Sequence, residues 1–343
     1  LFLFFPPLTL LAVTIPFLAR ITTETTQSVG LQVGRLSAIS TVGSVIGTLL
    51  ISYLLIPLAP NTYTMIMVVA LEIVLVAVYF LVFEKGFKQT PGVLPGILAG
   101  LVICGIAGRV EAVKSPSIGK ELFRKNSNFG LMQVVDSPSG DVRYYLNDYL
   151  TQNIFDPKED KSLTVFTYML RGLTHAYHPS PEKVLCIGLG VGIVPMQLAK
   201  EGSTIDVVEI NPGVVEIGEK FFGLDKSEFN LHLEDGRYFL NASKEEYDVV
   251  ILDAFLGDSS PSHLMSRECF ESMNQRMKTD AVLVINAFGH FSEGEDFFMA
   301  SLDKTLRAVF KSVHIHDGTR GNVFFVASKK EGLEPHRSMD MSE

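Results

Sequence analysis

The sequence contains few cysteines and no motif of the common nucleophilic hydrolases. Cys104, Cys186 and Cys269 lack the spacing of a metal site or a redox pair, which favours a reducing compartment for the soluble part. No serine or cysteine stands in a nucleophile turn. His314 and His316 share one face of a predicted strand but have no third ligand beside them, so no metal site is predicted.

Charge is almost missing from the first third of the chain. Residues 1–108 contain four Lys or Arg and three Asp or Glu, whereas the remaining residues contain 25 and 35. This distribution predicts a membrane part joined to an acidic soluble part. The acidic part argues against a nucleic-acid partner and favours a small cationic substrate.

Four apolar segments have the composition of membrane helices, at residues 1–19, 34–58, 62–83 and 93–108. A hydrocarbon core needs about 20 residues, which the middle two supply fully. The chain starts inside an apolar run without a basic n-region, so we expect an incomplete first helix and no signal peptide. Glu72 lies near the middle of the third segment, where it marks either a functional site or a protonated, hydrogen-bonded carboxyl.

The remaining residues predict an α/β fold with a β-hairpin subdomain before a Rossmann-like, doubly wound parallel sheet. We expect domains at 1–108 (membrane), 109–160 (linker and hairpin), 161–330 (Rossmann-like) and 331–343 (a disordered polar tail). The linker covers 109–125, and the hairpin strands cover 130–135 and 143–146. Helices are expected at 162–174, 193–201, 212–222, 265–277 and 293–310. Strands are expected at 184–187, 205–210, 230–233, 247–252, 281–286, 312–316 and 322–328.

A nucleotide-binding unit lies at residues 183–211. A buried strand leads into a turn with Gly188, Gly190 and Gly192, and a helix and a second strand follow, ending at Glu209. Glycines let the backbone approach a ligand, and the helix after them presents unpaired N–H groups. Glu209 lies 21 positions beyond Gly188, near the ~20 expected for a carboxylate that binds ribose hydroxyls.

Two further strand ends carry carboxylates, Asp235 and Asp253. The carboxyl ends of parallel strands meet in one crevice, so these acids are expected beside the glycine turn. We expect Glu209 to hold the ribose, Asp235 with the adjoining Gly236 to hold the adenine, and Asp253 to face the reacting centre. Each acid could instead cap a turn or a helix.

Several motifs together resemble the spermidine synthase (polyamine aminopropyltransferase) family. The segment from Pro6-Pro-Leu through Gly34-Arg-Leu-Ser-Ala-Ile-Ser-Thr-Val-Gly-Ser44 resembles the transporter-like membrane portion of bacterial proteins fused to such domains. The motifs in the soluble part are Ile187-Gly-Leu-Gly-Val-Gly192, Val208-Glu-Ile-Asn211, Glu234-Asp-Gly-Arg-Tyr-Phe-Leu240, Tyr247-Asp-Val-Val-Ile-Leu-Asp-Ala-Phe255, and the hairpin residues Ser127-Asn-Phe129, Arg143-Tyr-Tyr-Leu-Asn147 and Gln152.

The resemblance implies transfer of an aminopropyl group from decarboxylated S-adenosylmethionine to a diamine or polyamine such as putrescine, with Asp253 as the base. Gln152, Tyr168 and Asp258 are then the expected acceptor-binding residues, with residues 256–263 as a gate over the substrates. It also implies an integral protein of the bacterial inner membrane with a cytoplasmic soluble domain. A homo-oligomer or a membrane-protein partner is compatible with this arrangement, and no metal is expected.

Three positions depart from the family pattern. Val191 replaces an Asp that pairs with the donor's terminal amine, Phe166-Thr-Tyr168 replaces Tyr-His-Glu, and Ala254-Phe-Leu256 replaces Ser-Ser-Asp, with Asp258 as a displaced substitute. A methyltransferase that uses intact S-adenosylmethionine therefore stays open. So do a catalytically silent membrane subunit or polyamine sensor and, since the glycine turn and Glu209 fit one, a nicotinamide dehydrogenase.

Overall fold

The computed structural model describes residues 5–23, 29–82, 92–113, 118–255, 260–289, 296–318 and 321–339. These residues form two compact units, Leu1–Glu111 and Ala112–Glu343. The finer division expected from the sequence stays a prediction. Of the expected gate, residues 256–259 with Asp258 lie outside the described residues.

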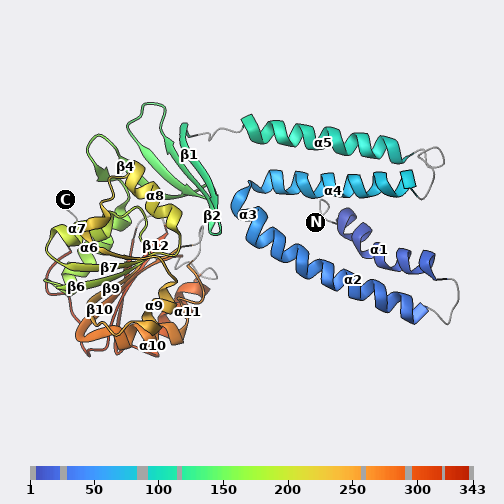
Figure 1. Cartoon of the computed structure of the whole chain (residues 1–343). Helices are drawn as coiled ribbons and strands as arrows, with labels where there is room; N and C mark the ends of the chain where they lie inside the picture. Colours follow the sequence, from blue (N-terminus) through green and yellow to red (C-terminus); the bar gives the residue numbers. More distant parts are fainter. Residues whose placement is uncertain are drawn as a thin grey trace. The chain divides into compact units, whose positions relative to one another are not determined.

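The described residues of the first unit form helices (Figure 1). Among them, three stretches are long and apolar enough to cross a membrane by length and composition: 29–58, 61–82 and 93–111. The expected span at 1–19 corresponds to a helix whose apolar stretch, Leu11–Thr22, is shorter. Glu72 is exposed on the helix α4. The elements are α1 (Phe5–Thr22), α2 (Val29–Leu50), a π-helical turn (Ile51–Leu55), α3 (Ile56–Leu58), α4 (Asn61–Val82) and α5 (Val93–Val113).

The second unit begins with a five-stranded antiparallel sheet in the order β1-β2-β3-β4-β5. The predicted hairpin is confirmed as β2 and β3, where Arg143 pairs with Asp136 at 2.7 Å. The linker expected at 109–125 was wrong at both ends, because α5 continues to Val113 and β1 starts at Lys120. Charged residues on β1 hid its strand character, although Phe123 packs on the core. The strands are β1 (Lys120–Ser127), β2 (Gly130–Asp136), β3 (Arg143–Asn147), β4 (Leu150–Asp156) and β5 (Lys161–Ser162).

The rest of the second unit is built around a seven-stranded sheet in the order β11-β12-β10-β9-β6-β7-β8. Strands β8, β7, β6, β9 and β10 pair in parallel, as expected. Strand β12 pairs antiparallel with both β10 and β11, so the sheet is mixed and not wholly parallel as expected. The strands are β6 (Lys183–Ile187), β7 (Thr204–Val208), β8 (Asn230–His232), β9 (Tyr247–Leu252), β10 (Met277–Phe288), β11 (Ser312–Asp317) and β12 (Asn322–Ser328).

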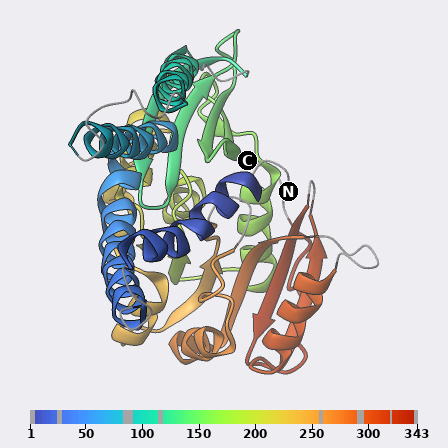
Figure 2. The ribbon, with the colours of Figure 1, turned by 90° about the vertical axis from the view of Figure 1, so that its right-hand side faces the viewer.

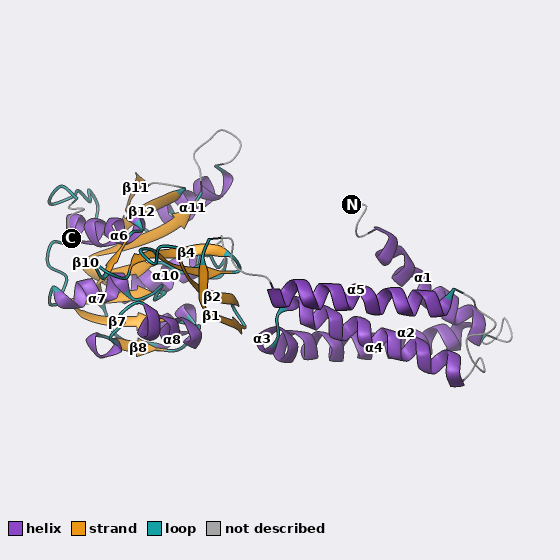
Figure 3. Ribbon diagram, turned by 90° about the horizontal axis from the view of Figure 1, so that it is seen from above, coloured by secondary structure: helices purple, strands orange, loops and turns teal. Residues whose placement is uncertain are grey.

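Helices cover both faces of this sheet, which confirms the doubly wound fold (Figures 2 and 3). Alternate residues of β6 enter opposite cores: Val184 and Cys186 join one cluster, while Leu185 and Ile187 join the other. The short helix α9 was not expected from the sequence. The helices are α6 (Val165–Tyr177), α7 (Ile193–Lys200), α8 (Pro212–Phe221), α9 (Gly236–Ala242), α10 (Arg267–Arg276) and α11 (Phe297–Arg307).

The tail expected to be disordered after Lys329 is packed as far as residue 339. Leu333 is only 5% exposed, and the backbone N–H of His336 donates to the Ala176 carbonyl at 2.7 Å. A single leucine in a polar stretch is a weak signal in the sequence, yet it anchors this segment to the core.

Candidate active site

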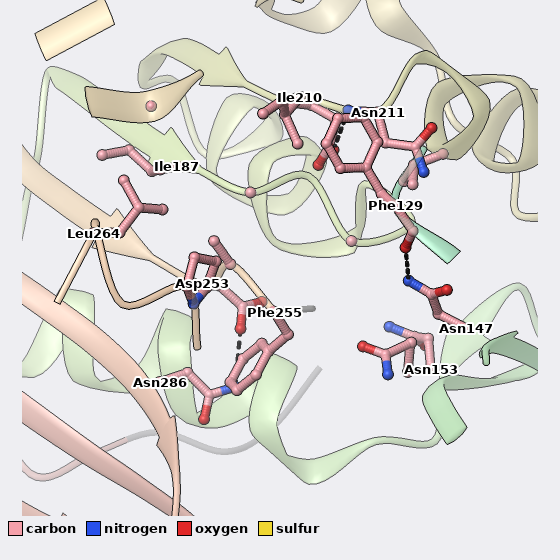
Figure 4. A pocket seen from close by; sticks show the side chains of 18 of the residues that line it. Phe129, Asn147, Asn153, Ile187, Ile210, Asn211, Asp253, Phe255, Leu264 and Asn286 are labelled. Carbon is pink, nitrogen blue, oxygen red and sulfur yellow. Dashed lines mark hydrogen bonds between the residues drawn. The ribbon is translucent and has the colours of Figure 1, made fainter. Parts of the chain in front are cut away.

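A cavity of about 560 Å³ lies at the carboxyl ends of β6, β7, β9 and β10 and is closed on one side by residues of β3 and β4. Ligand pockets in proteins typically measure about 300–1,000 Å³. Figure 4 shows side chains from both sheets directed towards this space. Its polar lining includes Asn147, Thr151, Gln152, Asn153, Thr164, Glu209, Asn211, Glu234, Asp235, Asp253, His263, Asn286 and Asn322.

The three turn glycines differ in what surrounds them. Gly188 has φ +98°, and a Cβ there would lie 2.2 Å from the Asp253 carbonyl oxygen. Gly192, the N-cap of α7, has φ +91°, and a Cβ would lie 2.2 Å from Leu224 Cδ1. Gly190 has φ +56° and lines the cavity, and a Cβ would meet no described atom within 4 Å. Gly188 and Gly192 therefore allow close packing, while Gly190 leaves room for a ligand.

Glu209 follows β7, and its carboxylate is fixed by the turn itself. Its Oε2 accepts from the Leu189 N–H at 3.0 Å, and its Oε1 accepts from the Asn211 N–H at 2.7 Å. Burial raises the pKa of this carboxyl above its ordinary value, against the opposing effect of the backbone N–H groups. The group lines the cavity in a fixed orientation, which suits an acceptor for hydroxyl groups.

Asp235 caps α9 and also meets a histidine. Its Oδ1 accepts from the Tyr238 N–H at 2.9 Å, and its Oδ2 lies 2.9 Å from Nε2 of His263. Burial acts to raise its pKa, but the Tyr238 N–H and His263 bring it below the ordinary value. Gly236 adjoins it in the wall, where a Cβ would lie 2.6 Å from Ile187 Cγ2. The side chain of His263, from the segment 256–263 expected as a gate, is 46% exposed and lines the cavity.

Asp253 stands at the end of β9, where its N–H donates to the Ile187 carbonyl at 2.9 Å. Its Oδ1 accepts from Asn286 Nδ2 at 2.9 Å (Figure 4). Burial raises the pKa of the carboxyl to about 6, and the Asn286 amide opposes this shift. Such a carboxylate is ionised at neutral pH and is a better proton acceptor than an exposed aspartate.

The expected acceptor-binding residues have different positions. Gln152 lines the cavity, whereas Tyr168 does not: its hydroxyl donates to the Ser162 carbonyl at 2.7 Å, and Phe166 occupies the wall instead. Val191 is 1% exposed in the apolar core and lines a small second cavity that also touches Asp253. Among the described residues, no cluster of three or more metal-ligating side chains is present.

Residues 164–316 match the family model of the spermine/spermidine synthase domain. The polyamine aminopropyltransferase of Vibrio vulnificus is 37% identical over 140 residues, which cover 39% of this chain and 46% of the relative. That of Streptococcus pneumoniae is 26% identical over 224 residues, which cover 62% of this chain and 76% of the relative.

The fold has a counterpart among solved structures. A spermidine synthase in complex with the transition state analogue AdoDATO superposes with a TM-score of 0.54 at 20% identity, over 64% of this chain and 77% of that one. The chain thus spans less than half of the first relative and about three quarters of the second relative and of this structure. The second unit therefore contains a region, residues 164–316, that matches the spermine/spermidine synthase domain, and the relatives similar to it are named polyamine aminopropyltransferases.

Proposed function

We propose that this protein is a membrane-anchored transferase that moves an aminopropyl group from decarboxylated S-adenosylmethionine to a nitrogen of a diamine or polyamine. The observation that carries the proposal is the position of Asp253. Its carboxylate, with a pKa raised to about 6, lines the same cavity as Gly190 and Glu209. A proton acceptor and a nucleoside-binding turn in one cavity are what the reaction requires.

The donor's nucleoside would lie against the glycine turn. Gly190 leaves open space, Glu209 presents a fixed carboxylate to the ribose hydroxyls, and Asp235 stands at the adenine end beside Gly236. Because Tyr238 and His263 already contact Asp235, an adenine amino group would have to share its Oδ2 with His263. A carboxylate oxygen has two lone-pair sites, so this sharing is feasible.

In the transfer step, the amine nitrogen attacks the aminopropyl carbon bonded to the donor sulfonium. The new C–N bond forms as the C–S bond breaks, and the C–S electron pair remains on sulfur, giving neutral methylthioadenosine. Asp253 accepts the proton that the attacking nitrogen must lose, because a protonated amine has no lone pair. Before it takes the proton, the anionic carboxylate also attracts the ammonium group and holds the nitrogen in place.

The acceptor would lie along Gln152 and the neighbouring amide Asn153 of β4. Asp258 remains a candidate for the acceptor's second ammonium group, whereas Tyr168 is not proposed, because its hydroxyl is bonded to the Ser162 carbonyl. The three long apolar helices would anchor the protein in a bacterial inner membrane, with the second unit in the cytoplasm. A homo-oligomer or a membrane-protein partner is compatible with this placement.

The test uses the purified full chain with decarboxylated donor and a panel of diamines and polyamines. We expect transfer, tight binding of methylthioadenosine, and loss of transfer but not of binding in Asp253→Asn. Asp303→Asn is the control, since Asp303 lies on α11 and pairs with Arg307 away from the cavity. Unchanged turnover in Asp253→Asn would remove Asp253 from its role, and absence of turnover in the wild type would refute the proposed transfer.

Val191 favours a second candidate, a methyltransferase that uses intact S-adenosylmethionine. The side chain is 1% exposed in an apolar cluster and offers no charge to a donor's terminal ammonium at that position of the turn. Intact and decarboxylated donors compared against the same amine panel separate the two reactions. Methylated products made only with intact donor would replace the first proposal with the second.

A further inference from the structure

Two asparagines form a hydrogen-bonded chain behind Asp253. Asn286 Nδ2 donates to Asp253 Oδ1 at 2.9 Å, and Asn322 Nδ2 donates to Asn286 Oδ1 at 2.9 Å. Both asparagines line the cavity, and Asn286 is 1% exposed. Neither residue belongs to the glycine turn or to the strand-end acids described above.

The chain of bonds fixes the orientation of both amides. A carboxylate accepts hydrogen bonds only, so Asn286 must turn its NH₂ group towards Asp253 and its carbonyl oxygen away. That oxygen would be a costly unpaired acceptor at a buried position, and Asn322 supplies its donor. Reversal of the Asn286 amide would place two oxygens against each other and break both bonds.

The mixed sheet makes this arrangement possible. Strand β12 pairs antiparallel with β10, so that Asn322 is opposite Phe288 and Phe324 is opposite Asn286. Asn322 is therefore the diagonal neighbour of Asn286 on the same face, within reach of its side chain. The antiparallel strand thus brings a residue 69 positions beyond Asp253 to the end of β9.

We propose that Asn286 and Asn322 are positioning residues, a two-amide relay that commits Oδ1 of Asp253 to the protein and leaves Oδ2 for the reacting amine. This assignment rests on the proposed function only for the identity of the amine. The relay also stabilises the ionised carboxylate, because a donor hydrogen bond favours the charged form. Its loss should therefore raise the pH at which Asp253 ionises.

Other titratable groups lie around Asp253. The buried Cys186 thiol lies on the adjacent strand β6, with its pKa raised by burial and by the Asp253 charge. Glu209, Asp235 and His263 line the same cavity from other elements. Asn286→Leu and Asn322→Ala leave all four groups in place. A change in the pH at which Asp253 ionises would therefore come from the loss of the two asparagine hydrogen bonds.

Infrared spectroscopy of the full chain measures the relay without turnover. The protonated-carboxyl band present in wild type and absent in Asp253→Asn identifies Asp253, and its midpoint is expected near pH 6. In Asn286→Leu the carboxylate of Asp253 loses the hydrogen bond from the Asn286 amide. Because a hydrogen bond to a charged group is stronger than one between neutral groups, the midpoint should rise by about one pH unit or more. Asn322→Ala should give a smaller rise, because Asn286 keeps its donor but loses its fixed orientation.

Asn230→Leu is the matched control. Asn230 Nδ2 donates to the buried Asp206 at 3.0 Å, the same kind of bond outside the cavity, so the Asp253 midpoint should not change. If Asn286→Leu does not fold, Asn322→Ala decides, because Asn322 is only partly buried.

An unchanged Asp253 midpoint in the folded relay variants would overturn the inference. If the wild type transfers aminopropyl groups, the acid limb of its kcat/KM profile should move upward with the infrared midpoint. A shifted midpoint in a protein without turnover would refute the proposed function and leave the relay intact.

Discussion

Alanine substitution at three glycines with positive φ distinguishes three roles: a strained backbone, close packing against another strand, and open space for a ligand. Gly188, Gly190 and Gly202 have φ of +98°, +56° and +101°. A Cβ is strained in such a backbone conformation, so each alanine variant should be destabilised by about 1–2 kcal/mol from this cause alone. At Gly188 the new Cβ would also lie 2.2 Å from the Asp253 carbonyl oxygen, a backbone atom that can move only with β9. Overpacking of this kind adds about 1–3 kcal/mol.

The expected free energies of unfolding follow directly. Gly188→Ala should lose about 2–5 kcal/mol, and Gly190→Ala and Gly202→Ala about 1–2 kcal/mol, because the added methyl group meets no described atom within 4 Å at either of the last two positions. For a unit of this size, 1 kcal/mol shifts the Tm by about 2–4 °C. Gly188→Ala should therefore melt about 4–20 °C below wild type, and the other two variants should melt about 2–8 °C below it.

Ligand affinity distinguishes the two milder variants. The Gly190 methyl group would project into the cavity, so the affinity for methylthioadenosine should fall at least about tenfold, equivalent to ~1.4 kcal/mol. Gly202 is not among the residues that line the cavity, so its variant should bind like wild type. Calorimetry on the purified full chain measures both quantities. Wild-type affinity in Gly190→Ala, or a Gly188→Ala variant that melts no lower than Gly202→Ala, would refute this assignment of the glycines.

Three further predictions concern Asp253, Asp235 and Leu333. The pKa of Asp253 is near 6 in the folded protein, above its unfolded value of about 4, so its charge costs stability as pH rises through that range. Asp253→Asn should consequently be more stable than wild type at pH 8, by about 2–3 kcal/mol, and should melt at nearly the same temperature as wild type at pH 4; a variant less stable than wild type at pH 8 contradicts the raised pKa. Asp235→Ala should lose about 1 kcal/mol of helix capping as well as nucleoside affinity, whereas Asp235→Ser should keep the cap of α9 and lose only affinity, as melting and binding curves would show. Leu333→Ala should cost about 2–4 kcal/mol in thermal unfolding, while exposed Arg337→Ala should be neutral; equal melting of the two would show that the tail does not stabilise the core.

The doubly wound unit could be predicted because its central strands are mostly apolar and are followed by glycine or acidic turns. The run from Tyr247 to Leu252 is buried along its whole length, which is typical of a central parallel strand. The glycine turn, Glu209 and Asp235 could be placed at one edge for the same reason, since the carboxyl ends of these strands share a side. Strand β1 and the packed tail escaped prediction, because single apolar residues such as Phe123 and Leu333 stand among charged ones and acquire meaning only from their tertiary contacts.

Side-chain pairing across elements could not be predicted in the same way. His263 and Asp235 come from different loops, and Asn322 reaches Asn286 only because β12 runs antiparallel to β10. A sequence pattern marks each residue on its own element but does not give the direction of the neighbouring strand. The sequence offered only a weak signal: Asn286 is the one polar residue in the buried stretch 281–287 of β10.

Tyr168 shows how the start of a helix decides which residue enters the site. Helix α6 begins at Val165, and Phe166 and Tyr168 are two positions apart, or about 200° around a helix of 3.6 residues per turn. One of the pair must therefore face away from the other, and the structure places Phe166 in the cavity wall and the Tyr168 hydroxyl on the Ser162 carbonyl. Under the proposed function, the start of α6 thus contributes an aromatic ring to the acceptor region, and the polar groups come from Gln152 and Asn153 on β4. Differences in amine selectivity between this chain and its relatives should accordingly follow substitutions on β4 more closely than substitution of Tyr168.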